Sequence, residues 1–471
     1  MLLAALLAGC SSFSPTGGKV SLRLPEPSPT TARMTAAERR EHRRILGSYG
    51  GHYENARIQK MVQDTVNRLT AASMRPDLKF RVTLLNSPAT NAFAMPNGHL
   101  YVTRGLVALA NDQSELASVL GHEMGHVIAR HAQLREKKAR QAAIMSRAVS
   151  NALSDPEGGA LALAKSKLTL ATFSRMQEFE ADAIGIKTSA RAGFDPYGAA
   201  RFLADMQRSA NLKSGGHGAP TTDFLSDHPS TPARVKMALV DARESGVKGI
   251  GARDRNAYLK DLNGIVYGED PSEGFVRGRR FVHPKLGFSF EAPPGFTLDN
   301  TAQAVLGLKD GGDEAMRLDV VSVPAGQSLA QYLNSGWIEN VDASSLRAFT
   351  VNGFPAATAL ASGKDWTFRL FAVRFGGDVY RFIFAAKTMT PAIDRTFRAS
   401  VGSFRRMTLK ERKRVRPLRV KIVTVGAHDT VVSMARRMAV SDHRLKRFRV
   451  LNGLGTKARL KPGTKVKIVV E

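Results

Sequence analysis

The sequence predicts a multidomain α+β protein with three parts in series: a mainly helical part with a small edge sheet, an antiparallel α+β part, and a small βααβ unit. The length of 471 residues indicates more than one core, because single cores rarely grow beyond about 250 residues. Apolar residues recur at helical spacing in the first half, and short alternating runs replace this pattern after about residue 275. Residues 418–470 read as strand, helix, helix, strand.

The composition is globular but strongly basic. Hydrophobic residues make up 43% and charged residues 23% of the chain, which excludes a largely disordered or fibrous protein. Lys and Arg number 69 against 41 Asp and Glu, so the net charge is +28. Such a balance indicates an anionic neighbour, either nucleic acid, a lipid surface or a wall polymer. The single cysteine, Cys10, excludes an intramolecular disulfide.

The first residues read as the end of a secretory signal. A short apolar stretch ends in the run LAGC at Cys10, which resembles a bacterial lipobox, although no Lys or Arg precedes it. We therefore expect a signal and lipobox over residues 1–9, a polar tether over residues 10–33, and lipidation of Cys10; the alternative is an apolar N-terminus without an anchor. Ser11 resembles the outer-membrane sorting pattern. No other run reaches the roughly 18 apolar residues that span a bilayer, so membrane attachment is expected through the lipid alone.

The first part is expected to be mainly helical, with one strand and one hairpin. The predicted helices cover residues 35–45, 55–69, 114–149 as one helix or two in succession, 174–192 and 196–206. The predicted strand covers residues 79–85, and the hairpin covers residues 91–102 with its turn at Asn97-Gly98.

Short strands separated by turns rich in Gly, Pro and Asp follow and predict an antiparallel sheet. They cover residues 281–290, 315–323, 347–350, 366–375 and 379–385. A basic connector then leads to the last unit. The expected domain bounds are 34–250, 275–408 and 418–471.

The run HEMGH carries residue types that suit a metal-dependent hydrolase. His122 and His126 are four residues apart, so on a helix both imidazoles face one ion. Glu123 follows the first histidine and is placed to take a proton from the attacking water rather than to bind the metal. Gly121 and Gly125 permit close packing of this helix. The alternative is a surface helix with two solvated histidines.

A catalytic zinc needs a third protein ligand and an open position. Glu178 and Asp182 are four residues apart on a predicted helix, so the glutamate is placed to ligate zinc and the aspartate to accept the distal N–H of a ligand histidine. Taken alone, an acidic helix is more commonly a solvated surface. His131 follows His126 by five residues, about 140° round a continuous helix, and is expected to be structural.

Four motifs in the same order resemble one family. HEMGH and the run S-R-x-x-E-x-x-A-D-x-x-G from Ser174 are similar to the gluzincin zinc metallopeptidases that include the CaaX prenyl protease, HtpX and BepA. The resemblance extends to the run NAFA from Asn91 and to HPSTPAR from His228, and it spans roughly residues 40–245. The chain lacks the apolar spans of the membrane members, so it is similar to the secreted, BepA-like branch.

The resemblance implies a zincin-type peptidase domain that holds one zinc ion. His122, His126 and Glu178 would be the ligands, Glu123 the general base, and Asp182 a residue that supports a ligand.

Three further features are implied by the same resemblance. The segment Asn91, Ala92, Phe93 and Ala94 would supply an edge strand that pairs with an extended substrate. His228 matches a histidine that can approach the metal and restrain activity in BepA-like members, although from the sequence alone such a residue is more often a loop histidine. Arg234 would either orient the site or cap a helix.

Residues 418–470 resemble a LysM module, which implies binding to the glycan of peptidoglycan. The resemblance rests on the runs DTV at Asp429, LNGL at Leu451 and LKPG at Leu460. His428 stands where a glycine commonly precedes the aspartate. The alternative is a small basic adaptor without a ligand. The many basic residues of this unit favour a wall polymer or lipid headgroups over nucleic acid.

The sequence therefore predicts a zinc metalloendopeptidase of the bacterial envelope that hydrolyses misfolded or misassembled envelope proteins. Its expected location is the periplasm, with a lipid anchor in the outer membrane. The alternative is a wall-tethered chaperone or scaffold whose peptidase site is restrained or inactive.

Overall fold

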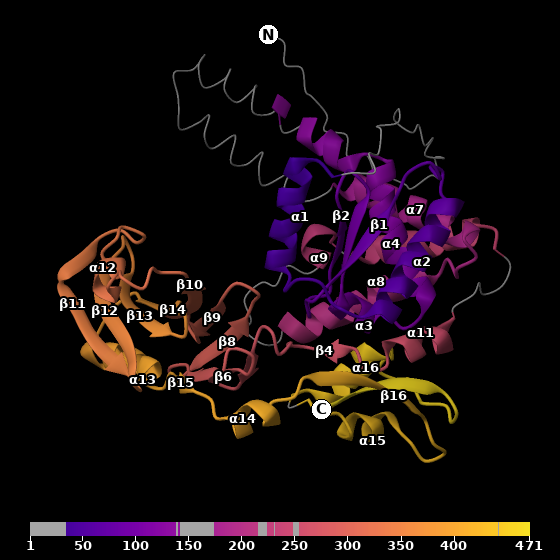
Figure 1. Ribbon diagram of the computed structural model, residues 1–471. Coiled ribbons are helices and arrows are strands. Elements are labelled where there is room, and N and C mark those ends of the chain that lie inside the picture. The colour runs from indigo at the N-terminus through magenta and orange to yellow at the C-terminus, as the bar shows by residue number, and fades with distance from the viewer. Residues whose placement is uncertain are drawn as a thin grey trace, which may run out of the picture.

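The computed structural model describes residues 34–137, 140–141, 174–214, 224–229, 231–247, 254–440 and 442–471 (Figure 1). The expected signal, lipobox and tether, including Cys10, lie outside these residues, as does the predicted helix beyond residue 141. We refer below to the described residues from 34 to 267 as the N-terminal domain, to residues 275–407 as the accessory domain, and to residues 418–471 as the C-terminal unit. No helix among the described residues has both the length and the apolar character that a membrane span requires.

The N-terminal domain is mainly helical, as expected. Its helices are α1 (Ala36–Ser48), α2 (Ala56–Ala72), α3 (Arg104–Leu109), α4 (Gln113–Ile128), α7 (Arg175–Arg191), α8 (Gly198–Ser214), α9 (Phe224–Asp227), α10 (Pro232–Glu244) and α11 (Arg255–Leu262). Several of them begin where the sequence offers a capping side chain. Thr35, Asn55, Asp112 and Ser174 each accept a hydrogen bond from the backbone N–H three residues on, which satisfies an otherwise unpaired donor at the helix start.

A three-stranded sheet packs against α4, the helix that contains the run HEMGH. Its strands are β1 (Arg81–Leu85), β2 (Ala92–Ala94) and β3 (His99–Thr103), in the order β1-β3-β2. The hairpin of β2 and β3 confirms the prediction, and Gly98 takes the positive φ of +84° that its turn requires. Among the residues that the structure describes, β2 pairs with β3 on one side only, so its other side is a sheet edge.

The accessory domain is built on antiparallel sheet, as predicted. A seven-stranded sheet has the order β11-β12-β13-β14-β10-β9-β8, and a four-stranded sheet has the order β15-β7-β6-β5. The strands and helices are β5 (Phe275–Arg277), β6 (Arg280–His283), β7 (Phe288–Glu291), β8 (Phe296–Asn300), β9 (Val305–Lys309), β10 (Glu314–Val321), α12 (Leu329–Leu333), β11 (Val341–Val351), β12 (Phe354–Ser362), β13 (Thr367–Phe375), β14 (Asp378–Ala386), α13 (Pro391–Gly402), β15 (Arg405–Arg406) and α14 (Leu409–Arg414).

The central strand β13 of the large sheet is buried on both faces. Phe371 packs into one apolar core and its neighbour Leu370 into another, because successive side chains of a strand point to opposite faces. The predicted strand 281–290 is in fact the hairpin β6–β7, since Gly287 turns the chain with φ +83°. β12 was not predicted: it is rich in alanine, which has little strand preference, and tertiary packing against α12 holds it in place.

The C-terminal unit has the predicted order of strand, helix, helix and strand. It consists of β16 (Leu418–Thr424), α15 (Val431–Arg436), α16 (Arg444–Leu451) and β17 (Lys465–Val470). Its sheet includes β4 (Val266–Tyr267), which follows α11 of the N-terminal domain, in the order β17-β16-β4. Figure 1 shows this unit lying beneath the N-terminal domain.

Candidate metal centre

Four side chains from three parts of the N-terminal domain meet at one point. α4 supplies His122 and His126, α7 supplies Glu178, and the residue after α9 is His228. One donor atom from each of these four lies within 4.8 Å of the others. All four side chains are buried.

Close packing of α4 on α7 brings these residues together. Gly125 lies against the backbone of Ala181. A Cβ on Gly185 would come within 2.7 Å of the backbone nitrogen of His122. Real Cβ atoms do not approach that closely, so only glycine fits here. The glycines beside the histidines are therefore needed to let Glu178 reach the imidazoles.

The donor separations match a tetrahedral zinc site. The His122 Nε2 atom lies 3.0 Å from His126 Nε2 and 3.3 Å from His228 Nδ1. The Glu178 Oε1 atom lies 3.0 Å from His228 Nδ1 and 3.5 Å from His126 Nε2. Ligands bound at about 2.0–2.1 Å around a tetrahedral ion are about 3.3 Å apart. Two or three imidazole nitrogens with one carboxylate oxygen are also a donor set that zinc prefers.

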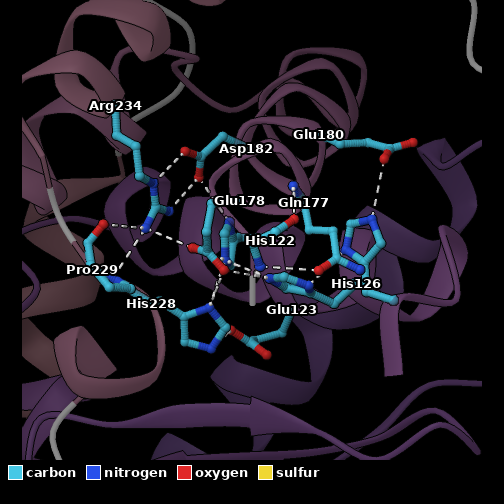
Figure 2. A network of polar contacts seen from close by, with 12 residues as sticks. His122, Glu123, His126, Gln177, Glu178, Glu180, Asp182, His228, Pro229 and Arg234 are labelled. Atoms are coloured by element: carbon cyan, nitrogen blue, oxygen red, sulfur yellow. Dashed lines mark hydrogen bonds and ion pairs between the residues drawn. The ribbon is translucent and has the colours of Figure 1, made fainter. Parts of the chain in front are cut away.

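Asp182 and Arg234 contact this cluster through His122 and Glu178 (Figure 2). Asp182 Oδ1 lies 2.8 Å from His122 Nδ1, and Arg234 bonds both oxygens of that carboxylate at 2.8 Å. Arg234 Nη1 also forms a 2.7 Å ion pair with Glu178 Oε2. Its backbone N–H lies at the start of α10, where Thr231 caps the helix. Arg234 therefore belongs to the site as well as to a helix terminus.

His131 contacts both His126 and Glu180, an arrangement that the helical spacing did not predict. His131 Nδ1 lies 2.8 Å from His126 Nδ1, and His131 Nε2 lies 3.2 Å from Glu180. α4 ends at Ile128, and Arg130 takes a left-handed φ of +56° before a new helical stretch begins at residue 131. The turn at Arg130 brings His131 back to the outer nitrogen of His126, where it is placed to fix the orientation of that ring.

Glu123 is buried beside the cluster. Its Oε1 atom lies 3.6 Å from His228 Nε2 and has no hydrogen-bond partner among the residues that the structure describes. Burial raises the pKa of this carboxyl above its ordinary value. A carboxylate with a raised pKa and an open lone pair is suited to accept and return a proton.

The surroundings of Glu178 and Asp182 favour the ionised form of each carboxyl despite its burial. Burial opposes a charged Glu178, but hydrogen bonds with His126 and His228 lower its pKa below the ordinary value. Burial likewise opposes a charged Asp182, but His122 and Arg234 lower its pKa. Burial lowers the pKa of His126 well below its ordinary value, and a neutral imidazole is the form that binds metals.

An open cleft leads to this point. It has a volume of about 810 Å³, and Glu123, His126 and His228 lie on its wall. Of the predicted edge-strand residues, Phe93 and Ala94 line the cleft. Ala92 is fully buried, while Asn91 precedes the strand and its side chain bonds the Tyr49 hydroxyl.

Comparison with known proteins agrees with this site. Residues 54–240 match Peptidase family M48. The mitochondrial metalloendopeptidase OMA1 of Schizosaccharomyces pombe is 34% identical over 189 residues, which cover 40% of this chain and 54% of that protein. The beta-barrel assembly-enhancing protease of Escherichia coli is 31% identical over 185 residues, covering 37% of this chain and 36% of that protein. The metalloprotease LoiP of Escherichia coli is 32% identical over 165 residues, covering 34% of this chain and 61% of that protein.

The chain thus spans between about one third and three fifths of the length of these relatives. The family match ends at residue 240 and does not reach the C-terminal unit, whose LysM-like character stays a prediction. The resemblance drawn from the ordered motifs is confirmed. Residues 54–240 are thus similar to Peptidase family M48, the family whose model they match.

Proposed function

We propose that this protein is a zinc-dependent metalloendopeptidase. The observation that carries the proposal is the buried cluster of His122, His126 and Glu178, at the separations of a zinc site, with Glu123 beside it. When bound there, zinc supplies a Lewis acid that polarises the scissile carbonyl and acidifies water. His122, His126 and Glu178 are the proposed ligands of one ion.

The remaining residues have separate tasks in the proposed reaction. Glu123 takes a proton from the attacking water and returns it to the leaving amine. Asp182 accepts the outer N–H of His122 and so fixes the ring that faces the ion. The free edge of β2 pairs with an extended peptide and aligns its scissile bond with Glu123.

We further propose that the substrates are misfolded or misassembled proteins of the bacterial envelope. Support comes from the lipobox-like run at Cys10 and from relatives named a beta-barrel assembly-enhancing protease and a metalloprotease. In this proposal the protein works in the periplasm, anchored to the outer membrane by lipid, and residues 418–470 hold it near peptidoglycan.

A second candidate is a scaffold or chaperone whose peptidase site is restrained, and one observation favours restraint. A catalytic zinc keeps one coordination position open, whereas His228 Nδ1 completes a fourfold donor set with the three proposed ligands. His228 would have to swing away before water and substrate enter. We therefore propose that the enzyme is active only after His228 is displaced.

Zinc content and proteolysis of unfolded casein by three proteins, the wild type, His228→Ala and the double variant His228→Ala/Glu123→Gln, test these proposals. His228→Ala should retain zinc and exceed the wild type in activity. The double variant should retain zinc and lose about 100-fold or more of the activity of His228→Ala, as expected when a general base is removed. Equal activity in His228→Ala and the double variant would refute the peptidase, and a His228→Ala protein slower than wild type would refute restraint.

A further inference from the structure

The cleft beside the metal centre is closed on one side by the accessory domain. Opposite β2 and α1, its wall is made by residues that follow β8 or lie on β9 and β10, namely Thr301, Ala302, Gln303, Leu306 and Arg317. Figure 1 shows β8 and β9 on the side of the accessory domain that faces α1. The side chain of Gln303 donates a 3.4 Å hydrogen bond to the Ser48 hydroxyl at the end of α1. A peptide bound along β2 would therefore meet both domains.

Leu306 and Arg317 present one continuous patch to the cleft. They are directly paired across β9 and β10, so their side chains leave the same face of the sheet. Asp299 of β8 pairs with Leu306 on that face, but it lines the adjoining cavity with Asn86 and Arg104 and is not on the cleft wall. Arg317 is the charged accessory-domain residue on the cleft wall.

The charge of Arg317 is only partly balanced. Its Nε donates to Asp319 at 2.8 Å, but Arg381 already binds both oxygens of that carboxylate at 2.7 and 2.8 Å. Arg381 is held firmly in this role, because its third nitrogen donates to the Tyr332 hydroxyl and its guanidinium lies 4.7 Å from the centre of the Trp337 ring.

Two guanidinium groups therefore share one carboxylate. The two Nη groups of Arg317 make no hydrogen bond to any residue that the structure describes, and its side chain is 45% exposed. Elsewhere on the cleft wall, Glu41 is paired with Arg44 at 2.6 Å. The accessory wall thus offers a planar, outward-facing cation, a group that binds carboxylates through paired N–H donors.

We propose that Arg317 is a specificity-determining residue that selects peptide segments bearing Asp or Glu. The inference rests on the proposed peptidase function and adds the substrate class to it. In an extended peptide paired with β2, every second side chain projects to the same face. The acidic preference is accordingly expected at one subsite or at two alternate subsites, not along the whole peptide.

Cleavage-site profiling tests this directly. Wild type and the variants Arg317→Ala, Arg317→Glu and Arg347→Glu are each incubated with a peptide library of mixed sequence, and the products are sequenced by mass spectrometry. Arg347 lies exposed on β11, at the far end of the same sheet, so its reversal is a matched control for net charge. If the wild type is restrained, the same variants are made in the His228→Ala protein.

The expected result is an excess of Asp and Glu at a fixed subsite for wild type and Arg347→Glu. Arg317→Ala should abolish the excess, and Arg317→Glu should shift the preference between acidic and basic side chains by about tenfold. An acidic excess that persists in Arg317→Glu, or its absence from the wild-type profile, would overturn the inference while leaving the peptidase proposal intact. A lack of any cleavage would count against the peptidase instead.

When no cleavage occurs, a binding measurement separates failure of the Arg317 inference from failure of the peptidase proposal. In the Glu123→Gln protein, fluorescence anisotropy compares an acidic unfolded protein with the same protein after its carboxylates are amidated. The acidic form should bind more tightly than the amidated form. Arg317→Glu should reduce this difference in affinity about tenfold, and Arg347→Glu should leave it unchanged. Equal loss in both variants would show general attraction to a basic chain and would refute the role of Arg317.

Discussion

The C-terminal unit and the accessory domain are joined to the N-terminal domain in opposite ways. The C-terminal unit shares a sheet with it, because β16 pairs with β4 at Tyr267 and Val266. Val420 of β16 also belongs to the apolar core of the N-terminal domain. The accessory domain packs its apolar side chains into separate cores of its own. The C-terminal unit is therefore continuous with the fold of the N-terminal domain, and the accessory domain is an addition to it.

The chain order makes the same distinction. β4 ends at Tyr267 and β16 begins at Leu418, and these two residues are antiparallel partners. The intervening residues 268–417 thus leave the sheet and return to it at one point. Such an insertion can carry a substrate-binding wall without taking part in the fold that positions the metal ligands.

Lys467 links the C-terminal unit to the end of α3, which directly precedes α4. Its fully buried Nζ donates to the carbonyls of Ala108, Leu109 and Ala110 at 2.8, 3.0 and 2.8 Å. These carbonyls form the end of α3, and a cation at a helix C-terminus satisfies unpaired acceptors and opposes the helix dipole. Asp112, the cap of α4, follows two residues later.

The largest effect is expected from Lys467→Met. This change leaves three buried carbonyls without a donor, and each unsatisfied buried acceptor costs about 1–3 kcal/mol. The free energy of unfolding should therefore fall by about 3 kcal/mol or more, as measured by hydrogen exchange of the α3 and α4 amides. Lys421→Met, at an exposed position on β16, is the control and should change it by less than about 0.5 kcal/mol. Equal losses in the two variants would show that Lys467 is not a special link.

Asp182→Asn should have the next largest effect, on the metal centre alone. The amide keeps the volume of the side chain but loses the charge that Arg234 and the outer nitrogen of His122 bind. Loss of such a supporting group typically weakens metal binding about 10- to 100-fold. Competition with a chromogenic chelator measures this affinity, and Arg317→Ala in the accessory domain should leave it unchanged. Weaker zinc binding in Arg317→Ala would mean that the accessory domain does take part in positioning the ligands.

The sequence predicts the local parts of this site well, and the reason is geometric. The spacing of His122 and His126, or of Glu178 and Asp182, depends only on one helix and its 3.6-residue turn. The angular position expected for His131 was wrong, because the helix was assumed to continue through Arg130, whose left-handed φ instead interrupts it.

Long-range pairings left weaker signals in the sequence. The partnership of β4 with β16 joins residues far apart in the chain, and a two-residue strand carries no periodicity. The alanine-rich β12 and the buried position of Lys467 likewise depend on neighbours that only the fold supplies. A lysine in a strand normally predicts a solvated side chain.

Glu269, in the segment between β4 and β5, should give a smaller and pH-dependent effect. Burial raises the pKa of its carboxyl to about 7, although it accepts hydrogen bonds from the Val276 N–H and Arg277. Between pH about 4.5 and 7 the folded state then binds more protons than the unfolded state, so stability falls as the pH rises.

Glu269→Gln removes this loss. It should leave the free energy of unfolding unchanged at pH 4.5 and raise it by about 1–2 kcal/mol at pH 8. Urea unfolding at both pH values measures the difference. A gain of the same size at both would show that it arises from side-chain packing and not from ionisation.

Deletion of residues 268–417, which include the accessory domain, is expected to change the stability of the remaining protein least. Because Tyr267 and Leu418 are antiparallel partners, residues 268–417 can be replaced by the two-residue turn Asn-Gly, which suits a tight hairpin. The shortened protein should keep its zinc affinity, and hydrogen exchange of α4 should change by less than about 1 kcal/mol, since neither the apolar core nor Lys467 is touched. It should also cleave peptides without the acidic preference that Arg317 confers. Loss of zinc binding would show that the accessory domain stabilises the metal centre, and that the two attachments do not differ as their contacts indicate.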